Sequence, residues 1–235
     1  MSFKSELEDF ACSIGADLFG VADLTDRAAH DHVLWQGGEM LARFPKGISI
    51  GIRLVDAVID ELYRHDEPSP IYSYRGLYNS VNSDLDRVTL AIAKRIQEEG
   101  YSAYPIPASQ TIDDRKLSGA VSHKLLANLS GLGWIGKNCL LITPEFGPRV
   151  RLASVFTDAL LEAGVPIENR CGDCVDCVEI CPPGAFTGVK FDPEEPRDVR
   201  FRANMCRNYT RQRAELLGEG ICGLCVYVCP KGKKT

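Results

Sequence analysis

Eight of the ten cysteines of this chain lie between residues 171 and 229, at spacings that suit iron–sulfur chemistry. The motif CGDCVDCVEICPP supplies four of them, CGLCVYVCP supplies three, and Cys206 stands between the two motifs. The run Cys-x2-Cys-x2-Cys-x3-Cys-Pro binds 4Fe–4S clusters in pairs, and its fourth cysteine ligates the other cluster. The sequence therefore predicts two 4Fe–4S clusters, whose chemistry is one-electron transfer.

The spacing also assigns each cysteine to one of the two clusters. Three thiolates at three-residue spacing on a tight loop can occupy three corners of one cubane, whereas the cysteine before the proline points away from that loop. The first cluster is predicted to bind Cys171, Cys174, Cys177 and Cys229. The second is predicted to bind Cys181, Cys222, Cys225 and Cys206, the last of which fills the position that the second motif leaves open.

Zinc sites and disulfides are the alternatives for these cysteines. Zinc prefers tetrahedral sites made from pairs of cysteines, and three cysteines between residues 171 and 177 crowd a single zinc ion. Structural disulfides need an oxidising compartment. The N-terminus MSFKSELEDF carries acids where a signal peptide carries a basic patch, so we expect a cytoplasmic protein. The remaining cysteines, Cys12 and Cys139, are expected to be buried as small hydrophobic residues.

The bulk composition argues against two classes of partner. No run approaches the ~20 apolar residues of a membrane-spanning helix, so we expect no membrane association. The chain has 27 basic and 32 acidic residues, and its formal net charge of −5 provides no general attraction to nucleic acid. A redox partner and a small molecule remain as the expected partners.

Upstream of the cysteines the sequence predicts a mixture of helices and strands. Helices are predicted over KSELEDFACSIGA and over 81–97, and Gly100 follows the second as a stop. GISIGIRL alternates with period two, and VRLASVFTD is similar, so both are predicted strands. EPSPIYSYRGLYNSVN is rich in Pro, Ser and Tyr and is predicted to be a surface loop. Because helices and strands do not alternate regularly, the predicted class is α+β, with one domain over 1–164 and a cluster domain over 165–235.

The stretch GLGWIGKN, residues 131–138, contains two nucleotide-binding patterns that fail on their context. The dinucleotide fingerprint GxGxxG must follow a strand and open a helix, but a predicted helix, SHKLLANLS, precedes it and a predicted strand, NCLLIT, follows. The phosphate-loop pattern GxxxxGK needs Ser or Thr next, where this chain has Asn138. A helix C-cap at Gly131 with a turn into a strand is the plainer interpretation.

GLGWIGK, LLITPEFGPRVRLASVFTD and the double cysteine motif together resemble the epoxyqueuosine reductase family, which is related to the corrinoid-dependent reductive dehalogenases. The resemblance extends over about residues 45–230 and is specific over 122–230. It implies a nitroreductase-like N-terminal domain that holds a cobalamin, followed by a ferredoxin-like module whose two clusters pass it electrons. The family's reaction is reductive removal of an epoxide oxygen from a modified tRNA base. The residues that the resemblance places around the corrinoid are Ser122, Gly131, Gly133, Trp134, Ile135, Gly136, Lys137 and Asn138.

Three features depart from that family. The family's aspartate general acid falls at Leu117, with Asp113 and Asp114 just upstream but out of register. The helix before the glycine stretch has the sequence SGAVSHKLLANL instead of the family's usual residues. The sequence ends a few residues after Cys229, without the helical-repeat extension that helps to grip tRNA. We therefore expect a small substrate rather than tRNA.

Reductive cleavage also needs a proton for the leaving group. The candidate donors are His123, Asp114 and Tyr74, with Tyr72 and Tyr78 on either side of the last. A histidine pKa near 6.5 suits donation around neutrality, although a lone histidine on a helix is more often structural. The tyrosines can equally be pocket-lining aromatics or loop anchors. Lys137 can pair with a phosphate or carboxylate of the corrinoid, or lie in solvent.

Two classes of function fit these features. One is a cobalamin-dependent iron–sulfur reductase that takes electrons from a ferredoxin- or flavodoxin-type donor. The other is an electron-transfer or activator protein that reduces a corrinoid or flavin partner protein. The segment ahead of the cysteines is longer than a simple ferredoxin needs, which favours the enzyme. A flavin in place of the cobalamin is a third alternative.

Overall fold

The computed structural model describes residues 2–26, 33–34 and 38–233. They divide into two compact units, each made of segments that are distant in the sequence. Unit 1 comprises Met1–Ile52, Val81–Gly133 and Arg151–Ile167, and unit 2 comprises Arg53–Ser80, Trp134–Val150 and Glu168–Thr235. The cysteine-rich region therefore folds together with two earlier segments. These units do not test whether residues 1–164 and 165–235 are independent domains, so that boundary stays a prediction.

A four-stranded sheet forms the centre of unit 1, with the strand order β1-β2-β6-β3. Its strands are β1 (Leu18–Asp23), β2 (Lys46–Arg53), β3 (Ala103–Ile106) and β6 (Val150–Thr157). β1 pairs antiparallel with β2, and β3 pairs antiparallel with β6. These antiparallel pairs fit the predicted α+β class, and the strands predicted over GISIGIRL and VRLASVFTD are confirmed.

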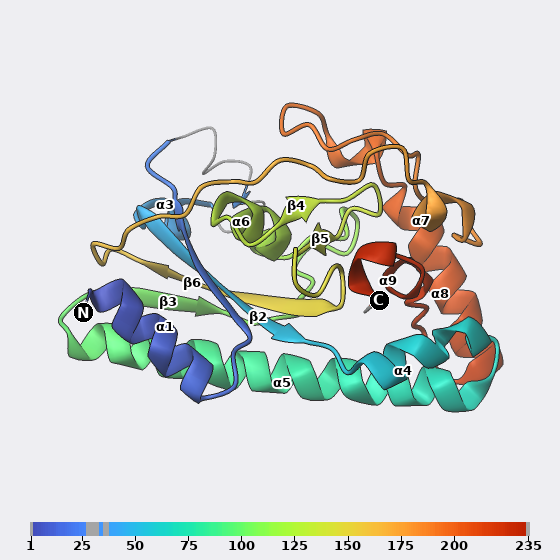
Figure 1. Cartoon of the computed structure of the whole chain (residues 1–235), viewed down its shortest axis with the longest axis horizontal. Coiled ribbons are helices and arrows are strands. Elements are labelled where there is room, and N and C mark those ends of the chain that lie inside the picture. Colours follow the sequence, from blue (N-terminus) through green and yellow to red (C-terminus); the bar gives the residue numbers. More distant parts are fainter. Residues whose placement is uncertain (1, 27–32, 35–37, 234–235) are drawn as a thin grey trace. The chain divides into compact units, whose positions relative to one another are not determined.

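Helices α1 (Phe3–Ser13) and α6 (His123–Leu129) both pack against β1 (Figure 1). The inner positions of β1 and β2 are buried without interruption, which is typical of strands with both faces covered. Gly47 allows the close approach of α6, because a Cβ at that position would lie 2.5 Å from Leu126 Cδ1. Leu126, Ala22, Phe44 and Phe156 belong to one buried hydrophobic cluster in this unit.

Helix α1 confirms the predicted N-terminal helix but corrects the expectation for one cysteine. Ser2 caps the helix by accepting a hydrogen bond from the Ser5 backbone N–H at 3.3 Å. Leu7 and Ala11 are the buried residues of the helix. Cys12 is exposed, contrary to the expectation, because it is about 100° around the helix from Ala11 and so leaves the buried face.

The predicted surface loop over residues 67–82 is wrong, because most of it forms the first half of a long helix. Helix α5 runs from Pro68 to Glu98, 31 residues, and Figure 1 shows it as one continuous helix. Proline is tolerated in the first turn, where its missing N–H would have no partner in the helix. The buried stripe of the predicted helix continues backward at helical spacing through residues that the prediction assigned to the loop. The stripe consists of Ile71, Tyr74, Val81, Leu85, Val88, Ile92 and Ile96.

Unit 2 contains short elements around the cysteine motifs, together with the first part of α5. Before the cysteines lie α4 (Asp56–Asp60), the 3-10 helix η1 (Glu61–Arg64) and the paired strands β4 (Trp134–Ile135) and β5 (Leu141–Ile142). The later elements are α7 (Asp176–Glu179), η2 (Arg197–Val199), α8 (Ala203–Leu217), α9 (Leu224–Tyr227) and η3 (Pro230–Gly232). The short helix α3 (Gly38–Ala42) belongs to unit 1. Across the described residues, no helix combines the length and apolar character needed to cross a bilayer.

Candidate metal centres

The four cysteines assigned to the first cluster line a single pocket of unit 2. Cys171, Cys174 and Cys177 come from the first motif, and Cys229 comes from the end of the second. Lys137, Asn138, Ile142, Asp176, Pro230 and Lys231 complete the lining. The structure thus brings together the four thiols that the crossed arrangement predicts, although Cys229 is far from the others in sequence.

The thiol of Cys177 shows why this group of side chains favours a cationic ligand. Burial, together with the nearby sulfurs of Cys229, Cys171 and Cys174, raises the pKa of the Cys177 thiol to about 12. Four neighbouring thiolates would repel one another in this setting unless a positive centre offsets their charge. The iron of a cluster would supply that charge, because metal coordination deprotonates a thiol outright.

The remaining four cysteines form a second group in the same unit. Burial, together with the nearby sulfurs of Cys222 and Cys181, raises the pKa of Cys206 to about 11. Burial also raises the pKa of Cys225, and the same three cysteines are among its charged neighbours. Cys206 of α8 therefore lies where the eighth ligand is predicted. Among the residues that the structure describes, no three His, Cys, Asp or Glu side chains converge closely enough to hold a single metal ion.

Short helices and prolines position these cysteines. Cys177 lies in α7 and Cys225 in α9, each a helix of four residues. Proline follows both outlying cysteines, and Pro230 opens η3 directly after Cys229. The Ala185 backbone N–H donates to Cys181 Sγ at 3.3 Å, which orients that sulfur within the second group.

The glycine stretch contacts the first cysteine loop through the side chains of Trp134 and Lys137. The Trp134 indole Nε1 donates to Cys171 Sγ at 3.4 Å. Lys137 Nζ donates to the carbonyl oxygens of Gly172 and Cys174, both at 3.0 Å. Lys137 is only 7% exposed, so it does not lie in solvent. These contacts assign Trp134 and Lys137 to the wall of the first cysteine group.

Asn138 and Asn169 extend this support on either side. Asn138 Nδ2 donates to the Cys225 carbonyl at 3.2 Å, while Asn138 Oδ1 accepts from the Leu140 N–H at 3.1 Å. Asn169 Nδ2 donates to the Ile135 carbonyl at 2.8 Å, and its Oδ1 accepts from the Cys171 N–H at 2.9 Å. One short stretch therefore contacts loops that carry cysteines of both groups.

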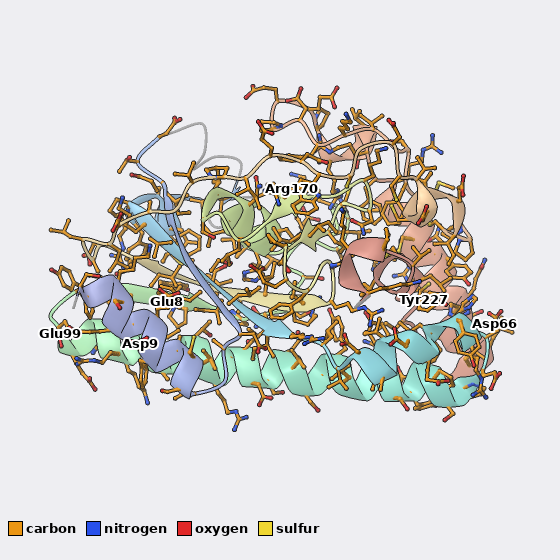
Figure 2. The ribbon with its side chains drawn as sticks, in the orientation of Figure 1. Glu8, Asp9, Asp66, Glu99, Arg170 and Tyr227 are labelled. Atoms are coloured by element: carbon orange, nitrogen blue, oxygen red, sulfur yellow. The ribbon has the colours of Figure 1, made fainter. Side chains whose placement is uncertain are left out.

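A guanidinium also lies beside the indole that contacts Cys171. The guanidinium carbon Cζ of Arg170 is 6.0 Å from the centre of the Trp134 ring, and Figure 2 labels Arg170. That distance is at the limit of a cation–π contact. Arg170 precedes Cys171 directly, so the contact helps to orient the start of the first motif.

Gly131 ends helix α6 in the way that the plainer interpretation predicts. Its φ is +81°, the left-handed conformation that glycine adopts readily. The Leu132 N–H donates to the Ala127 carbonyl at 3.0 Å, and the Gly131 N–H donates to the Asn128 carbonyl at 3.1 Å. This pair of bonds is a Schellman cap. The stretch follows a helix and leads into β4, so neither nucleotide-binding pattern has its required context.

The predicted strand NCLLIT is shorter than expected, because its first residues form a turn. The Cys139 N–H donates to the Gly136 carbonyl at 2.9 Å, and Cys139 has a φ of +54°. The strand itself is limited to β5. Cys139 is buried, as expected.

The three candidate proton donors are divided between the two units. His123 and Asp114 belong to unit 1, and Tyr74 belongs to unit 2. Tyr74 is buried on α5, with its ring against the cysteine loop, since a Cβ on Gly223 would lie 2.6 Å from Tyr74 Cε1. Tyr74 therefore anchors a loop, which is one of the two roles that the sequence left open for the tyrosines.

His123 has both ring nitrogens in hydrogen bonds. Its Nε2 lies 3.0 Å from the Pro107 carbonyl, and its Nδ1 lies 2.7 Å from Ser154 Oγ. Because a carbonyl only accepts, the proton belongs on Nε2, and the Ser154 hydroxyl donates to Nδ1. Part of the residue is accessible, yet desolvation of the ring lowers the His123 pKa to about 4. These contacts do not favour His123 as a proton donor near neutrality.

Ser122 and the acidic loop before it also have local structural roles. Ser122 caps α6 by accepting from the Leu125 N–H at 3.4 Å. Asp113 accepts from the backbone N–H groups of Lys116 and Arg115, which lowers its pKa. Asp114 is exposed, and Leu117 adopts a φ of +51° in the same loop.

Arg213 is a residue near the cysteines that the sequence analysis missed. It lies on α8, is 4% exposed, and raises the local positive charge beside Cys222. Its Nε donates to the Ile221 carbonyl at 3.2 Å, and its Nη1 lies 3.1 Å from a carboxylate oxygen of Asp66, labelled in Figure 2. Asp66 is distant in sequence, so no local motif could have indicated the pair.

Comparison with known proteins agrees with this geometry. Residues 170–232 match the 4Fe-4S double cluster binding domain, which supports two 4Fe–4S clusters. Over 149 residues the chain is 33% identical to the epoxyqueuosine reductase of Bacillus anthracis, covering 61% of this chain. Over 211 residues it is 27% identical to the epoxyqueuosine reductase of Leadbetterella byssophila, covering 81% of this chain and 66% of that protein.

The chain resembles the epoxyqueuosine reductases. This confirms the resemblance drawn from the glycine stretch and the cysteine motifs. The matched region spans 38% of the length of the Bacillus anthracis relative.

Solved structures show the same fold at low sequence identity. The epoxyqueuosine reductase from Streptococcus thermophilus superposes with a TM-score of 0.63 at 18% identity, covering 100% of this chain and 67% of that one. A reductive dehalogenase described with a mechanism for B12-dependent dehalogenation gives a TM-score of 0.74 at 18% identity, covering 97% of this chain and 31% of that one. The mixed helix-and-strand fold of this chain is therefore shared with both groups of enzymes.

Proposed function

We propose that this chain is an iron–sulfur reductase whose two 4Fe–4S clusters supply electrons, one at a time, to a corrinoid. The observation that carries the proposal is the gathering of eight cysteines into two groups of four, with each group drawn from both motifs. The resemblance to epoxyqueuosine reductases supports the reductase activity. The fold shared with a B12-dependent dehalogenase supports the corrinoid.

The residues of unit 2 fit the clusters. Cys171, Cys174, Cys177 and Cys229 would hold the first cluster, and Cys181, Cys206, Cys222 and Cys225 the second. Each cluster, when bound, supplies one electron at a time at low potential. The protein's part is to keep the sulfurs buried and oriented, which Trp134 and Ala185 do through N–H···S contacts.

The side chains of the glycine stretch do not offer the same fit to a corrinoid. The side-chain N–H groups of Lys137 and Asn138 donate hydrogen bonds to carbonyl oxygens of the cysteine loops. The space beside Gly136 is filled as well, since a Cβ there would lie 2.7 Å from Asn138 Oδ1. These side chains therefore belong to the cysteine loops, and we assign none of them to direct corrinoid contact.

We also propose a nitroreductase-like fold for unit 1, a small substrate, and an electron donor of the ferredoxin or flavodoxin type. The nitroreductase-like fold follows from the resemblance to the epoxyqueuosine reductases, and the antiparallel sheet of unit 1 is compatible with that fold. A small substrate follows from the net charge of −5, which gives no general attraction to a polyanion such as tRNA. Reductive cleavage of such a substrate consumes two electrons and a proton.

The test is to purify the protein without oxygen, count iron, sulfide and cobalt, and titrate the protein with cob(II)alamin while recording electron paramagnetic resonance. The proposal predicts about eight irons per chain. It also predicts saturable binding that changes the cobalt signal. Eight irons with no change in the cobalt signal would contradict the corrinoid part and favour a flavin enzyme or an electron carrier. Zinc in place of iron would contradict the whole proposal.

A further inference from the structure

The two cysteine groups differ in the charge that is buried beside them. In the part of the chain that the structure describes, Lys137 pairs with no carboxylate, and its ammonium donates only to the Gly172 and Cys174 carbonyls. Arg213, beside Cys222 in the second group, has Asp66 at 3.1 Å. The buried ammonium of the first group therefore has no carboxylate of the described residues in contact with it, whereas the guanidinium near the second group contacts Asp66, whose side chain is exposed.

The groups also differ in the kind of donor to their sulfurs and in the exposure of single cysteines. The Trp134 side-chain N–H donates to Cys171 Sγ in the first group, and the Ala185 backbone N–H donates to Cys181 Sγ in the second. Trp134 is only 2% exposed, so water does not compete for this bond. Cys174 of the first group is exposed. Cys177 of the first group is buried, and all four cysteines of the second group are partly buried.

The buried charge of Lys137, the buried Trp134 donor and the exposed Cys174 all act to raise the reduction potential of the first cluster. Adding an electron makes a cluster more negative, so nearby positive charge, N–H···S bonds and solvent exposure all favour the reduced form. A charge in a buried site is screened less than one at the surface, so Lys137 weighs more than the exposed Lys231 of the same pocket. Asp176 also lines that pocket and opposes the effect, but it is exposed.

We propose that Trp134 and Lys137 hold the reduction potential of the first cluster above that of the second. An electron shared between the clusters then rests on the first, which is reduced by one electron as the second is oxidised by one. This inference rests on the proposed function only in that both clusters must be present. It gives the glycine stretch a role in setting the direction of electron transfer.

The experiment is an anaerobic redox titration of the whole chain, followed by electron paramagnetic resonance, on wild type, Trp134→Phe, Lys137→Met and Lys231→Met. Wild type should show two midpoint potentials. Trp134→Phe and Lys137→Met should each lower the higher midpoint and leave the other in place. A tenfold loss in the preference of the electron for the first cluster corresponds to ~59 mV. Lys231→Met removes the same charge from the same pocket at an exposed position and should produce a much smaller shift.

Three results would overturn the inference: movement of the lower midpoint, movement of neither, or an equal shift in Lys231→Met and Lys137→Met. If Lys137→Met loses iron because the first cysteine loop is no longer held, Trp134→Phe provides the same test. Lys137→Arg, which keeps the charge, should then keep the wild-type midpoint. A wild-type protein without two clusters would instead contradict the proposed function, so the two failures are distinguishable.

Discussion

Asn138 Nδ2 donates a hydrogen bond to the Cys225 carbonyl at 3.2 Å, across 87 residues of sequence. Asn138 belongs to the stretch that the sequence associates with a cofactor wall, and Cys225 lies in α9, in the middle of the second cysteine motif. The bond makes the glycine stretch part of the scaffold of the cysteine loops.

Asn138→Ala should destabilise the protein by about 1–3 kcal/mol, because it removes the partner of the Cys225 carbonyl and of the Leu140 N–H, which are partly buried. The measurement is anaerobic denaturant unfolding. Asn208→Ala is the control, because Asn208 is exposed on α8. Equal stability of Asn138→Ala and Asn208→Ala would show that the bond to Cys225 does not hold the loop.

Arg149→Met should lower the free energy of unfolding, since Arg149 is 2% exposed and pairs with Asp56 at 3.2 Å and Asp60 at 2.6 Å. Because both carboxylates are partly exposed, the loss is that of hydrogen bonds between charged groups, roughly 1.5–3 kcal/mol. Arg95→Met provides the comparison, because Arg95 pairs with Glu98 and Glu99 at the surface, where such pairs contribute about 0–1 kcal/mol. A similar loss of stability in both variants would contradict the buried role of Arg149.

His123 should make stability depend on pH. Its folded pKa of about 4 lies below the ordinary 6.5, so the unfolded chain binds more protons between these pH values. The free energy of unfolding therefore falls as the pH drops through this window, by about 1 kcal/mol between pH 7.5 and 5.5. His123→Gln should lose this contribution to the slope, as measured by anaerobic unfolding at several pH values. An unchanged slope, or a His123 pKa near 6.5 by NMR, would refute the buried neutral histidine.

Gly223→Ala should disturb the second cluster more than a matched change elsewhere. Gly223 has a φ of +83°, and a Cβ there would lie 2.6 Å from Tyr74 Cε1 and 2.7 Å from Leu62 Cδ1. Gly184 has a φ of +58° and no atom within 4 Å of its Cβ position, so Gly184→Ala isolates the backbone strain of about 1–2 kcal/mol. Only Gly223→Ala should also lose iron, as determined by metal analysis. Full iron in Gly223→Ala would mean that the Tyr74 contact is dispensable.

The cysteine groups could be predicted from the sequence because their information is local. The spacing within each motif and the proline after Cys181 and Cys229 already separate the outlying cysteines from the rest. The Gly131 cap is local in the same sense, since it depends on the end of one helix. Cys206 could be assigned to the second cluster from the sequence because it was the one cysteine of the region that the two motifs left unassigned.

The errors and omissions arise where distant residues decide the structure. Pro68 and the tyrosines after it suggest a loop, but burial of Ile71 and Tyr74 along one stripe overrides their low helix propensity. The roles of Lys137 and Arg213 depend on partners that are far away in the sequence. No spacing rule indicates that a lysine after a glycine will bind a cysteine loop instead of a phosphate.

The most direct test of the central claim is the iron and sulfide content of anaerobically purified wild type, Cys206→Ala and Cys12→Ala. Wild type and Cys12→Ala should contain about eight of each per chain, because Cys12 is exposed and belongs to neither group. Cys206→Ala should lose the second cluster and keep about four irons, with the signal of the first cluster unchanged. Full iron in Cys206→Ala, or zinc in the wild-type protein, would contradict the crossed assignment of the eight cysteines.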